Sequence, residues 1–275
     1  MTGSGTGSVR PSSSAVEVFG AASRGAWRDA GEQVAFLGAV LRALGAAVAR
    51  PRKARGAEVV ALAHAAGVEA LGIVGLVNFL IGLIIAFIGG QVLATFGAQI
   101  FVADAIGIIM VRELGPIMTA ILVSGRTGSA YAAELGTMRV NEEVDALETM
   151  GLEPVPLLVL PRVLAGSLAT PLLTLYGMLA GVAAGLLQMS FLGFPLAVSQ
   201  ARLVEALSAG DLVLGVAKSV VFGFLVASVG CLRGLQAGRG PSAVGLAATR
   251  AVVSGIVLVI VVDALFAAVT TALGI

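Results

Sequence analysis

The sequence predicts an all-α membrane protein, with an interfacial amphipathic N-terminal helix, five transmembrane helices and a short cytoplasmic helix between spans two and three. The first observation is composition: of 275 residues, 58% are hydrophobic and 12% charged, and the mean hydropathy is +1.02. Soluble domains carry about 25% charged residues. The second and third observations are long uncharged runs and a one-sided distribution of Lys and Arg. The net charge of +1 gives no indication of a nucleic-acid partner.

The N-terminal region divides into a tail and a helix. Residues 1–14 are rich in Gly, Ser and Thr and lack the apolar core of a signal peptide, so we expect a disordered tail. We expect residues 15–66 to be an interfacial helical region. Its apolar residues recur at steps of three and four, with arginines beside them: Val34, Leu37, Leu41, Leu44 and Val48. An ordinary helix packed on a soluble partner is the alternative.

Uncharged runs locate the spans of a five-span domain at 67–275. Residues 70–103 carry no charge. As one helix that run would be roughly 51 Å long, against a hydrocarbon core of about 30 Å, so the chain crosses once and leaves near residues 95–97. The same reasoning gives these approximate spans: 70–96, 105–137, 159–188, 212–232 and 251–273.

The Lys and Arg residues predict the orientation. Most of the 17 lie before residue 56, in the loop between spans two and three, or in the loop between spans four and five. Arg202 is the only one in the opposite loops. The positive-inside rule therefore places the N-terminus in the cytoplasm and the C-terminus outside.

Spans two, four and five carry charges that need an explanation. A charge near the bilayer centre costs at least about 2.5–3.5 kcal/mol, so Arg112, Glu113, Arg126, Lys218 and Asp263 must be paired, hydrated or close to the headgroups. Arg112 and Arg126 should lie toward opposite sides of the membrane, because 14 residues of helix span about 21 Å. Gly115-Pro116 favours a bend beside Arg112 and Glu113. Such a patch suits an amphiphilic cargo with a polar head, and a buried Arg–Glu pair that only fixes packing is the alternative.

Small and reactive residues give weaker indications. Gly177, Gly181 and Gly185 repeat every four residues, which predicts a face for close helix packing. Cys231 is the only cysteine, so no intrachain disulfide forms, and the lone His64 gives no metal site.

The segment 140–151 predicts a short amphipathic helix on the cytoplasmic side. Four carboxylates precede Gly151, while Val144, Leu147 and Met150 recur at three-residue steps. A solvated surface helix is one interpretation. The other is a docking helix for a cytoplasmic partner, with Leu147 and Met150 as apolar anchors.

Several motifs in order resemble those of the MlaE/YrbE permease family, the membrane subunits of lipid-transporting ABC systems that work with MCE-domain proteins. They are RELGP (112–116), SGRTGSAYAAELGTM (124–138), EEVDALETMG (142–151), LPRVLAG (160–166), KSVVFG (218–223) and GCLRG (230–234). The resemblance runs from about residue 36 to the C-terminus.

The resemblance implies a homodimer in the bacterial inner membrane, with partners on both sides. An ABC ATPase would bind the cytoplasmic coupling helix, with a small STAS-type regulator on that ATPase, and an MCE-domain protein would bind outside. The coupling residues would be Glu142, Glu143, Asp145, Ala146, Leu147, Glu148, Met150 and Gly151. No GxxxxGK[ST] motif occurs, so we expect no enzyme activity and no cofactor in this chain, with ATP used by the partner subunit.

The resemblance also implies a site for lipid, with phospholipid as the expected class, passed between the membrane and the MCE-domain carrier. The lipid-binding residues would be Arg112, Glu113, Leu114, Leu76, Leu80 and Leu83. Lys218 and Asp263 would pair within the membrane. Two alternatives remain: an ion-coupled secondary transporter with Glu113, Lys218 and Asp263 as a proton relay, and a non-transporting scaffold. The absence of an inverted repeat weighs against the first.

Overall fold

The computed structural model describes residues 15–49 and 56–274, and all of its regular structure is helical. The predicted disordered tail, 1–14, lies outside the described residues. Within them, five helical segments are long and apolar enough to cross a membrane, as the sequence predicts. These are α2 (Gly56–Ala94), a segmented span at Gln99–Val140, a span at Val155–Phe191 that includes α7 (Leu160–Phe191), α9 (Ala209–Leu235) and α10 (Pro241–Leu273).

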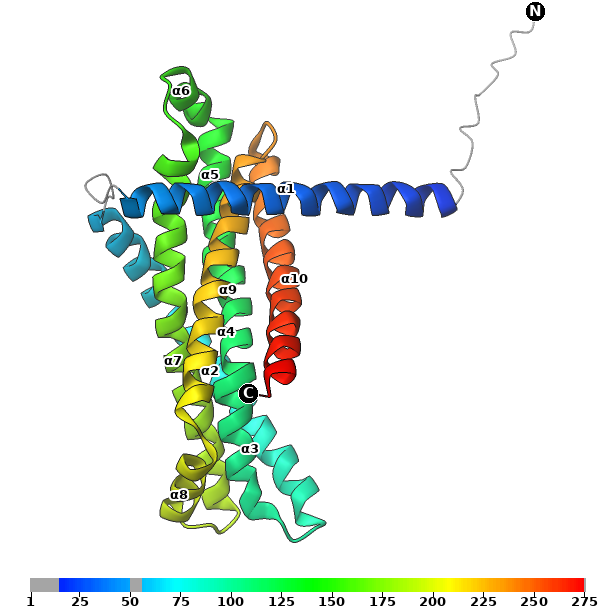
Figure 1. Cartoon of the computed structure of the whole chain (residues 1–275), viewed down its shortest axis with the longest axis vertical. Helices are drawn as coiled ribbons and strands as arrows, with labels where there is room; N and C mark the ends of the chain where they lie inside the picture. The colour runs from blue at the N-terminus through cyan, green and yellow to red at the C-terminus, as the bar shows by residue number, and fades with distance from the viewer. Residues whose placement is uncertain (1–14, 50–55, 275) are drawn as a thin grey trace, which may run out of the picture.

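The spans run side by side as an elongated bundle (Figure 1). The short helix α6 (Glu143–Thr149) lies at one end of the bundle and α8 (Leu196–Ala206) at the other. We refer to these as the α6 end and the α8 end. An odd number of spans places the start of α2 and the end of α10 toward opposite ends.

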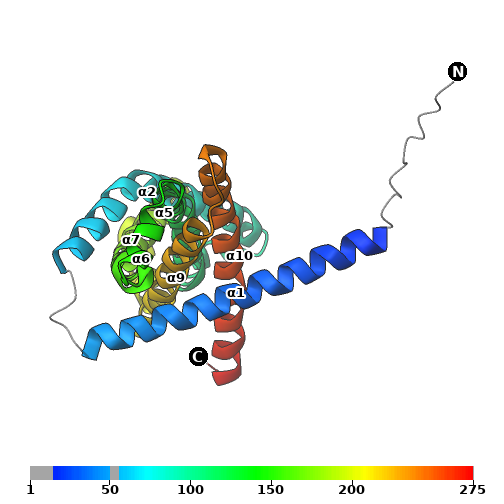
Figure 2. The ribbon, with the colours of Figure 1, turned by 90° about the horizontal axis from the view of Figure 1, so that it is seen from above.

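Helix α1 (Ala15–Ala49) lies across the bundle at the α6 end and extends well beyond it (Figures 1 and 2). Val40 is buried against a core cluster that includes Tyr131, whereas Trp27, Val34 and Leu41 form an exposed apolar stripe with seven-residue spacing. A helix with one face on the bundle and a separate apolar face fits the predicted position in the membrane interface.

Small residues bring α2 and α7 into close contact, which confirms the predicted packing role of the glycine face. A Cβ atom added to Gly82 would lie 2.1 Å from the carbonyl oxygen of Gly181, so the two backbones touch. A Cβ added to Gly177 would lie 2.8 Å from the amide nitrogen of Asn78, and one added to Gly185 would collide with Ile106. Larger side chains at these positions would force the helices apart.

The second span is one continuous helical path with two π-helical turns. It consists of α3 (Val102–Ile108), a π turn (Ile109–Leu114), α4 (Gly115–Val123), a second π turn (Ser124–Gly128) and α5 (Ser129–Val140). The first turn lies directly before Gly115-Pro116, where the sequence favours a bend, and the second contains Arg126. A third π turn, Val155–Val159, precedes α7. Such turns often occur at functional sites, and two of these carry intramembrane charges.

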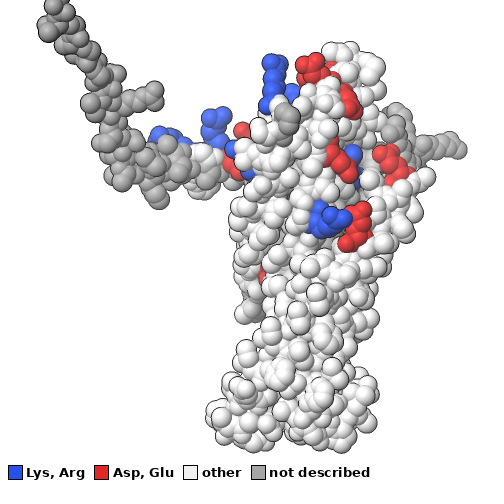
Figure 3. All heavy atoms as spheres, turned by 180° about the vertical axis from the view of Figure 1, so that it is seen from behind, with Lys and Arg blue, Asp and Glu red and all other residues white. Residues whose placement is uncertain are grey.

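The face seen in Figure 3 carries its visible charges between the α6 end and about the middle of the bundle, and the part toward the α8 end is uncharged. This distribution gives the spans an apolar surface that suits lipid contact.

Candidate functional site: a charge cluster inside the bundle

Lys218 lies at the centre of an ion-pair cluster that joins three spans. It projects from the middle of α9 and its side chain is 0% exposed. Its Nζ lies 2.5 Å from Oε2 of Glu113, in the first π turn, and 3.1 Å from Oδ1 of Asp263 on α10. The structure thus brings together the two residues of the predicted pair and places Glu113 beside them. Glu113 was predicted for the lipid site and, in the alternative of a secondary transporter, for a proton relay with the same two residues.

Arg112 extends the same cluster toward the α8 end. Its Nη1 lies 3.2 Å from Oδ1 of Asp211, and its Nε lies 3.8 Å from Oε1 of Glu113. Asp211 is held by a reciprocal capping box with Ser208 at the start of α9. The predicted fourth span begins at residue 212, so Asp211 was not counted among the intramembrane charges. We call Arg112, Glu113, Asp211, Lys218 and Asp263 the charge cluster.

The cluster is closed on one side and open on the other. The side chains of Arg112 and Glu113 are 24% and 34% exposed, whereas Lys218 is fully buried. Two cations and three carboxylates leave one formal negative charge if all are ionised. The pairing offsets much of the cost of placing charges in an apolar bundle. The partly exposed Arg112 and Glu113 together present a cation and an anion to whatever lies beside the helix.

The predicted lipid-binding leucines are dispersed. Leu76 and Leu80 lie on the exposed surface of α2 and Leu83 is half-buried. Leu114 packs partly against the core cluster around Ile106 and Met110. None of the four lines either of two surface hollows, one of 440 Å³ beside α1 and one of 900 Å³ between α2 and α7. Leu76 and Leu80 therefore present an exposed apolar surface on α2.

Arg126, the other arginine of span two, belongs to a separate ion pair closer to the α6 end. Its Nη2 lies 2.7 Å from Oε2 of Glu69 on α2, and both side chains are exposed. The two arginines of this span thus have different environments, one in a buried network and one at the surface.

Helix α6 presents carboxylates at the α6 end of the molecule. Glu142 adopts a left-handed backbone conformation with φ 61° and precedes the helix, and Gly151, with φ 74°, follows it. Val144 is buried, so it anchors α6 to the bundle instead of joining Leu147 and Met150 on a free face. Leu147 is half-buried. The remaining coupling candidates are exposed: Glu142, Glu143, Asp145, Ala146, Glu148, Met150 and Gly151.

One of these carboxylates already has a partner. Arg139, in the last turn of α5, forms an ion pair with Asp145. This contact ties α6 to span two and leaves Glu142 and Glu148 as the more available charges, since Glu143 accepts a hydrogen bond from Asn141. The exposed Met150 adds an apolar surface beside them.

A comparison with protein families identifies the chain. The family described as Permease MlaE matches residues 59–269. This range contains the charge cluster, α6 and all five spans except the residues at the start of the first span and at the end of the last. The chain belongs to the MlaE permease family.

Relatives of this MlaE permease occur in bacteria and in a plant. It is 34% identical over 199 residues to a probable ABC transporter permease protein of Rickettsia prowazekii, covering 71% of this chain and 76% of the relative. A probable ABC transporter permease protein of Synechocystis is 38% identical over 154 residues, with coverages of 54% and 57%. The chloroplast protein trigalactosyldiacylglycerol 1 of Arabidopsis thaliana is 40% identical over 153 residues, with coverages of 55% and 44%.

Family membership and the five apolar helices make the chain a multi-pass membrane permease subunit. As an ABC transporter permease, this MlaE protein is a transmembrane component, and its family implies a separate ATPase partner.

Proposed function

We propose that this permease moves phospholipid between the bacterial inner membrane and an MCE-domain carrier outside it, driven by a separate ABC ATPase. The observation that carries the proposal is the partly open charge cluster. Arg112 and Glu113 are partly exposed at the bundle surface. Asp211 pairs with Arg112, Lys218 pairs with Glu113, and Asp263 pairs with Lys218. A zwitterionic or anionic headgroup finds donors and acceptors there that a purely apolar span does not offer.

In this proposal the lipid lies partly on α2. Its headgroup contacts Arg112 and Glu113, and its acyl chains lie against Leu76 and Leu80, with Leu83 and Leu114 as half-buried neighbours. The Arabidopsis relative bears the name of a galactolipid, which supports a lipid as cargo. The leucines form a surface in one chain, so a second protomer would be needed to enclose the lipid.

A homodimer with α10 near the protomer boundary would supply that enclosure. Only 11% of the most apolar window of α10 is buried, the smallest share among the five spans of the described chain. Exposed valines and leucines such as Val261 and Leu265 continue along it. Native mass spectrometry of the purified permease tests the dimer, and a monomer at all detergent concentrations would contradict it.

On the cytoplasmic side, α6 would fit into the ATPase and transmit the effect of ATP hydrolysis to span two. Exposed carboxylates and Met150 provide the contact surface, and the ion pair between Arg139 and Asp145 provides a mechanical link to α5. A STAS-type regulator would act on the ATPase rather than on this chain. The MCE-domain protein would bind at the α8 end.

The contact among Glu113, Lys218 and Asp263 also suits a proton relay, so ion-coupled transport is the second candidate. The two functions differ in energy source. Lipid movement in vesicles that requires ATP and the ATPase supports the first, and movement driven by a proton gradient alone supports the second.

The first experiment is a mild-detergent pulldown of the tagged protein from its own membranes, with mass spectrometry of proteins and lipids. We expect an ATPase, an MCE-domain protein and stoichiometric phospholipid. The double variant R112Q/E113Q should lose most of the lipid assigned to this site. The matched control R126Q removes the other arginine of the same span, which pairs with Glu69, and should retain it. A lipid-free chain that purifies alone, or equal lipid loss in both variants, would contradict the proposal.

A further inference from the structure

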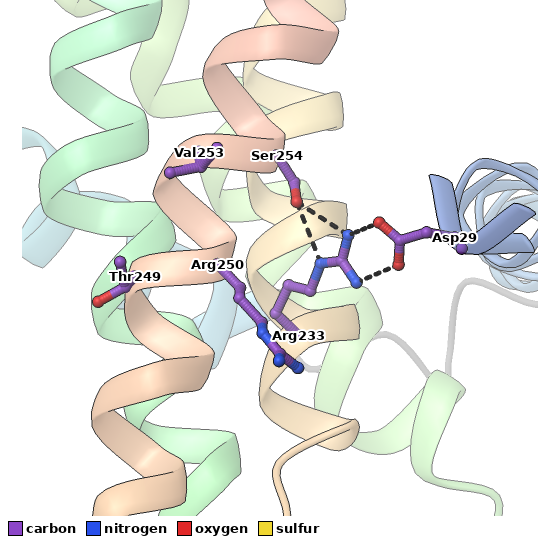
Figure 4. A pocket seen from close by; sticks show the side chains of 7 residues that line it. Asp29, Arg233, Thr249, Arg250, Val253 and Ser254 are labelled. Atoms are coloured by element: carbon purple, nitrogen blue, oxygen red, sulfur yellow. Dashed lines mark hydrogen bonds and ion pairs between the residues drawn. The ribbon is translucent and has the colours of Figure 1, made fainter. Parts of the chain in front are cut away.

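A hollow of 440 Å³ lies where α1 crosses α9 and α10 at the α6 end, far along the bundle from the charge cluster (Figures 1 and 4). It is lined by Gly25, Asp29, Arg233, Thr249, Arg250, Val253 and Ser254.

Arg233 in this hollow is fully engaged by the protein. Its Nη1 and Nη2 donate to the two carboxylate oxygens of Asp29, at 2.6 Å and 2.5 Å. Its Nε and Nη2 donate to Ser254 Oγ, and Nη1 also donates to Gln236 Oε1. These contacts use all five N–H groups of the guanidinium. Arg233 therefore fastens α1 to the bundle, and its charge and that of Asp29 offset each other.

Arg250 lines the same hollow but is not engaged in this way. Figure 4 shows its side chain reaching toward Arg233 from α10, with no dashed line joining the two. Among the residues that the structure describes, no hydrogen bond or ion pair holds its guanidinium, which is exposed. Two guanidiniums and one carboxylate leave a net positive charge. The free fork of N–H donors on Arg250 has the geometry that binds phosphate oxygens in pairs.

The surroundings of the hollow indicate a ligand with acyl chains. Trp27, Val34 and Leu41 expose an apolar stripe on α1, which places this helix at the depth of the headgroups. Val253, at the edge of the hollow, begins an exposed apolar face that continues along α10 through Val257 and Ile260 toward the α8 end. A molecule with its phosphate at Arg250 would have an apolar surface for its chains along α10, toward the α8 end.

We propose that this hollow binds the phosphate of a phospholipid from the leaflet at the α6 end, with Arg250 as the main donor. Ser254 contributes a hydroxyl group beside it, and the chains follow α10. The site is separate from the charge cluster, and it does not depend on the proposed direction or mechanism of transport.

The test is binding of phosphatidylglycerol to the purified full-length protein in mild detergent, followed by native mass spectrometry. The variant R250Q should weaken one binding event by roughly ten-fold, as expected for loss of a charge-assisted hydrogen-bonding group. V253W, which fills the hollow and keeps the charge, should weaken the same event. R239Q, an equal charge change in the exposed loop before α10, should bind like the unaltered protein.

Two further ligands separate the possible sources of the phosphate. R250Q should not weaken the binding of diacylglycerol with the same chains. Inorganic phosphate should not displace phosphatidylglycerol. Displacement by inorganic phosphate would mean a site for soluble anions and would overturn the lipid assignment. Unchanged phosphatidylglycerol binding in both R250Q and V253W would overturn the site itself. R112Q, in the charge cluster, should leave the binding event at Arg250 unchanged. A failure of the transport proposal can therefore be distinguished from a failure of the site at Arg250.

Discussion

Lys218 is the residue on which the charge cluster depends, because it is fully buried and contacts Glu113 and Asp263 together. K218M would leave two carboxylates side by side with their cation removed. Removing one partner of a buried ion pair typically costs about 3–5 kcal/mol. We expect a marked fall in the thermal unfolding temperature in detergent, measured by the loss of the folded peak in size-exclusion chromatography.

Two variants distinguish this network from a simple Lys218–Asp263 pair. D263N should destabilise the protein less than K218M, because Lys218 keeps Glu113 at 2.5 Å. The swap K218D/D263K would be tolerated by an isolated pair, but here it places a carboxylate next to Glu113 and should not restore stability. If the swap behaves like the unaltered protein, Glu113 is not part of the network.

Asp29 gives the attachment of α1 a predictable dependence on pH. Hydrogen bonds from Arg233 hold the pKa of this carboxyl below its ordinary value of 3.8. A lowered folded-state pKa means that the contact stabilises the structure above pH 3.8 and that this contribution is lost as the pH falls below it. We expect the cleavage of α1 by an acid-active protease to accelerate in that acidic range in the unaltered protein.

D29N should show the accelerated cleavage of α1 already at neutral pH. E32Q is the matched control, since Glu32 only accepts a hydrogen bond from Gln236 and glutamine retains an acceptor oxygen. The cleavage rate of α1, measured at neutral pH with a protease that is active there, tests this prediction. Equal rates for D29N and E32Q at neutral pH would show that the Asp29–Arg233 contact does not hold the helix.

At the scale of elements, α6 is predicted to carry the contact with the ATPase. Asp145 pairs with Arg139, so changing it disturbs the link to α5 as well as the surface. Glu148 is exposed and makes the cleaner probe. E148K should reduce co-purification of the ATPase several-fold while membrane insertion and unfolding temperature stay unchanged. E205K, a charge reversal at another exposed glutamate, on α8 at the opposite end, should co-purify the ATPase normally.

Some properties of the helical elements can be predicted from the sequence, and others cannot. Burial of apolar side chains in lipid depends on local composition, so the five spans and their order follow from uncharged runs. The π turns in span two were not predicted beyond the bend favoured at Gly115-Pro116, since hydrogen bonding to residue i−5 leaves no periodic signature over five or six residues.

Pairing between distant charges was harder to predict than the spans themselves. The contacts of Arg126 with Glu69 and of Arg233 with Asp29 were missed, and Glu113 was grouped with Lys218 only in the proton-relay alternative. Each depends on the rotation and register of two helices that hydropathy does not define. The Lys218–Asp263 pair was expected because both residues match charged positions in spans four and five of the family that the sequence resembles. The lipid-site role of Arg112 and Glu113 stays a prediction.

At the scale of the whole molecule, the proposed mechanism requires the α6 end to face the cytoplasm and the α8 end to face outward. Arg139, Arg162, Arg233, Arg239 and Arg250 lie in or beside the connections at the α6 end, whereas Arg202 lies in α8. The positive-inside rule predicts the required orientation from this asymmetry. Cys231, the single cysteine of the sequence, is fully buried, so the unaltered protein should react little with a water-soluble thiol reagent.

One cysteine placed at each end therefore reports its own side of the membrane. In intact spheroplasts, a membrane-impermeant maleimide should label E205C, because Glu205 is 76% exposed on α8. It should label E148C only after the membrane is opened by detergent. The reverse pattern would place α6 outside, where an ATPase that depends on cytoplasmic ATP cannot reach it. Coupling through α6 would then fail even if the charge cluster binds lipid, because that cluster needs only an apolar bundle around it.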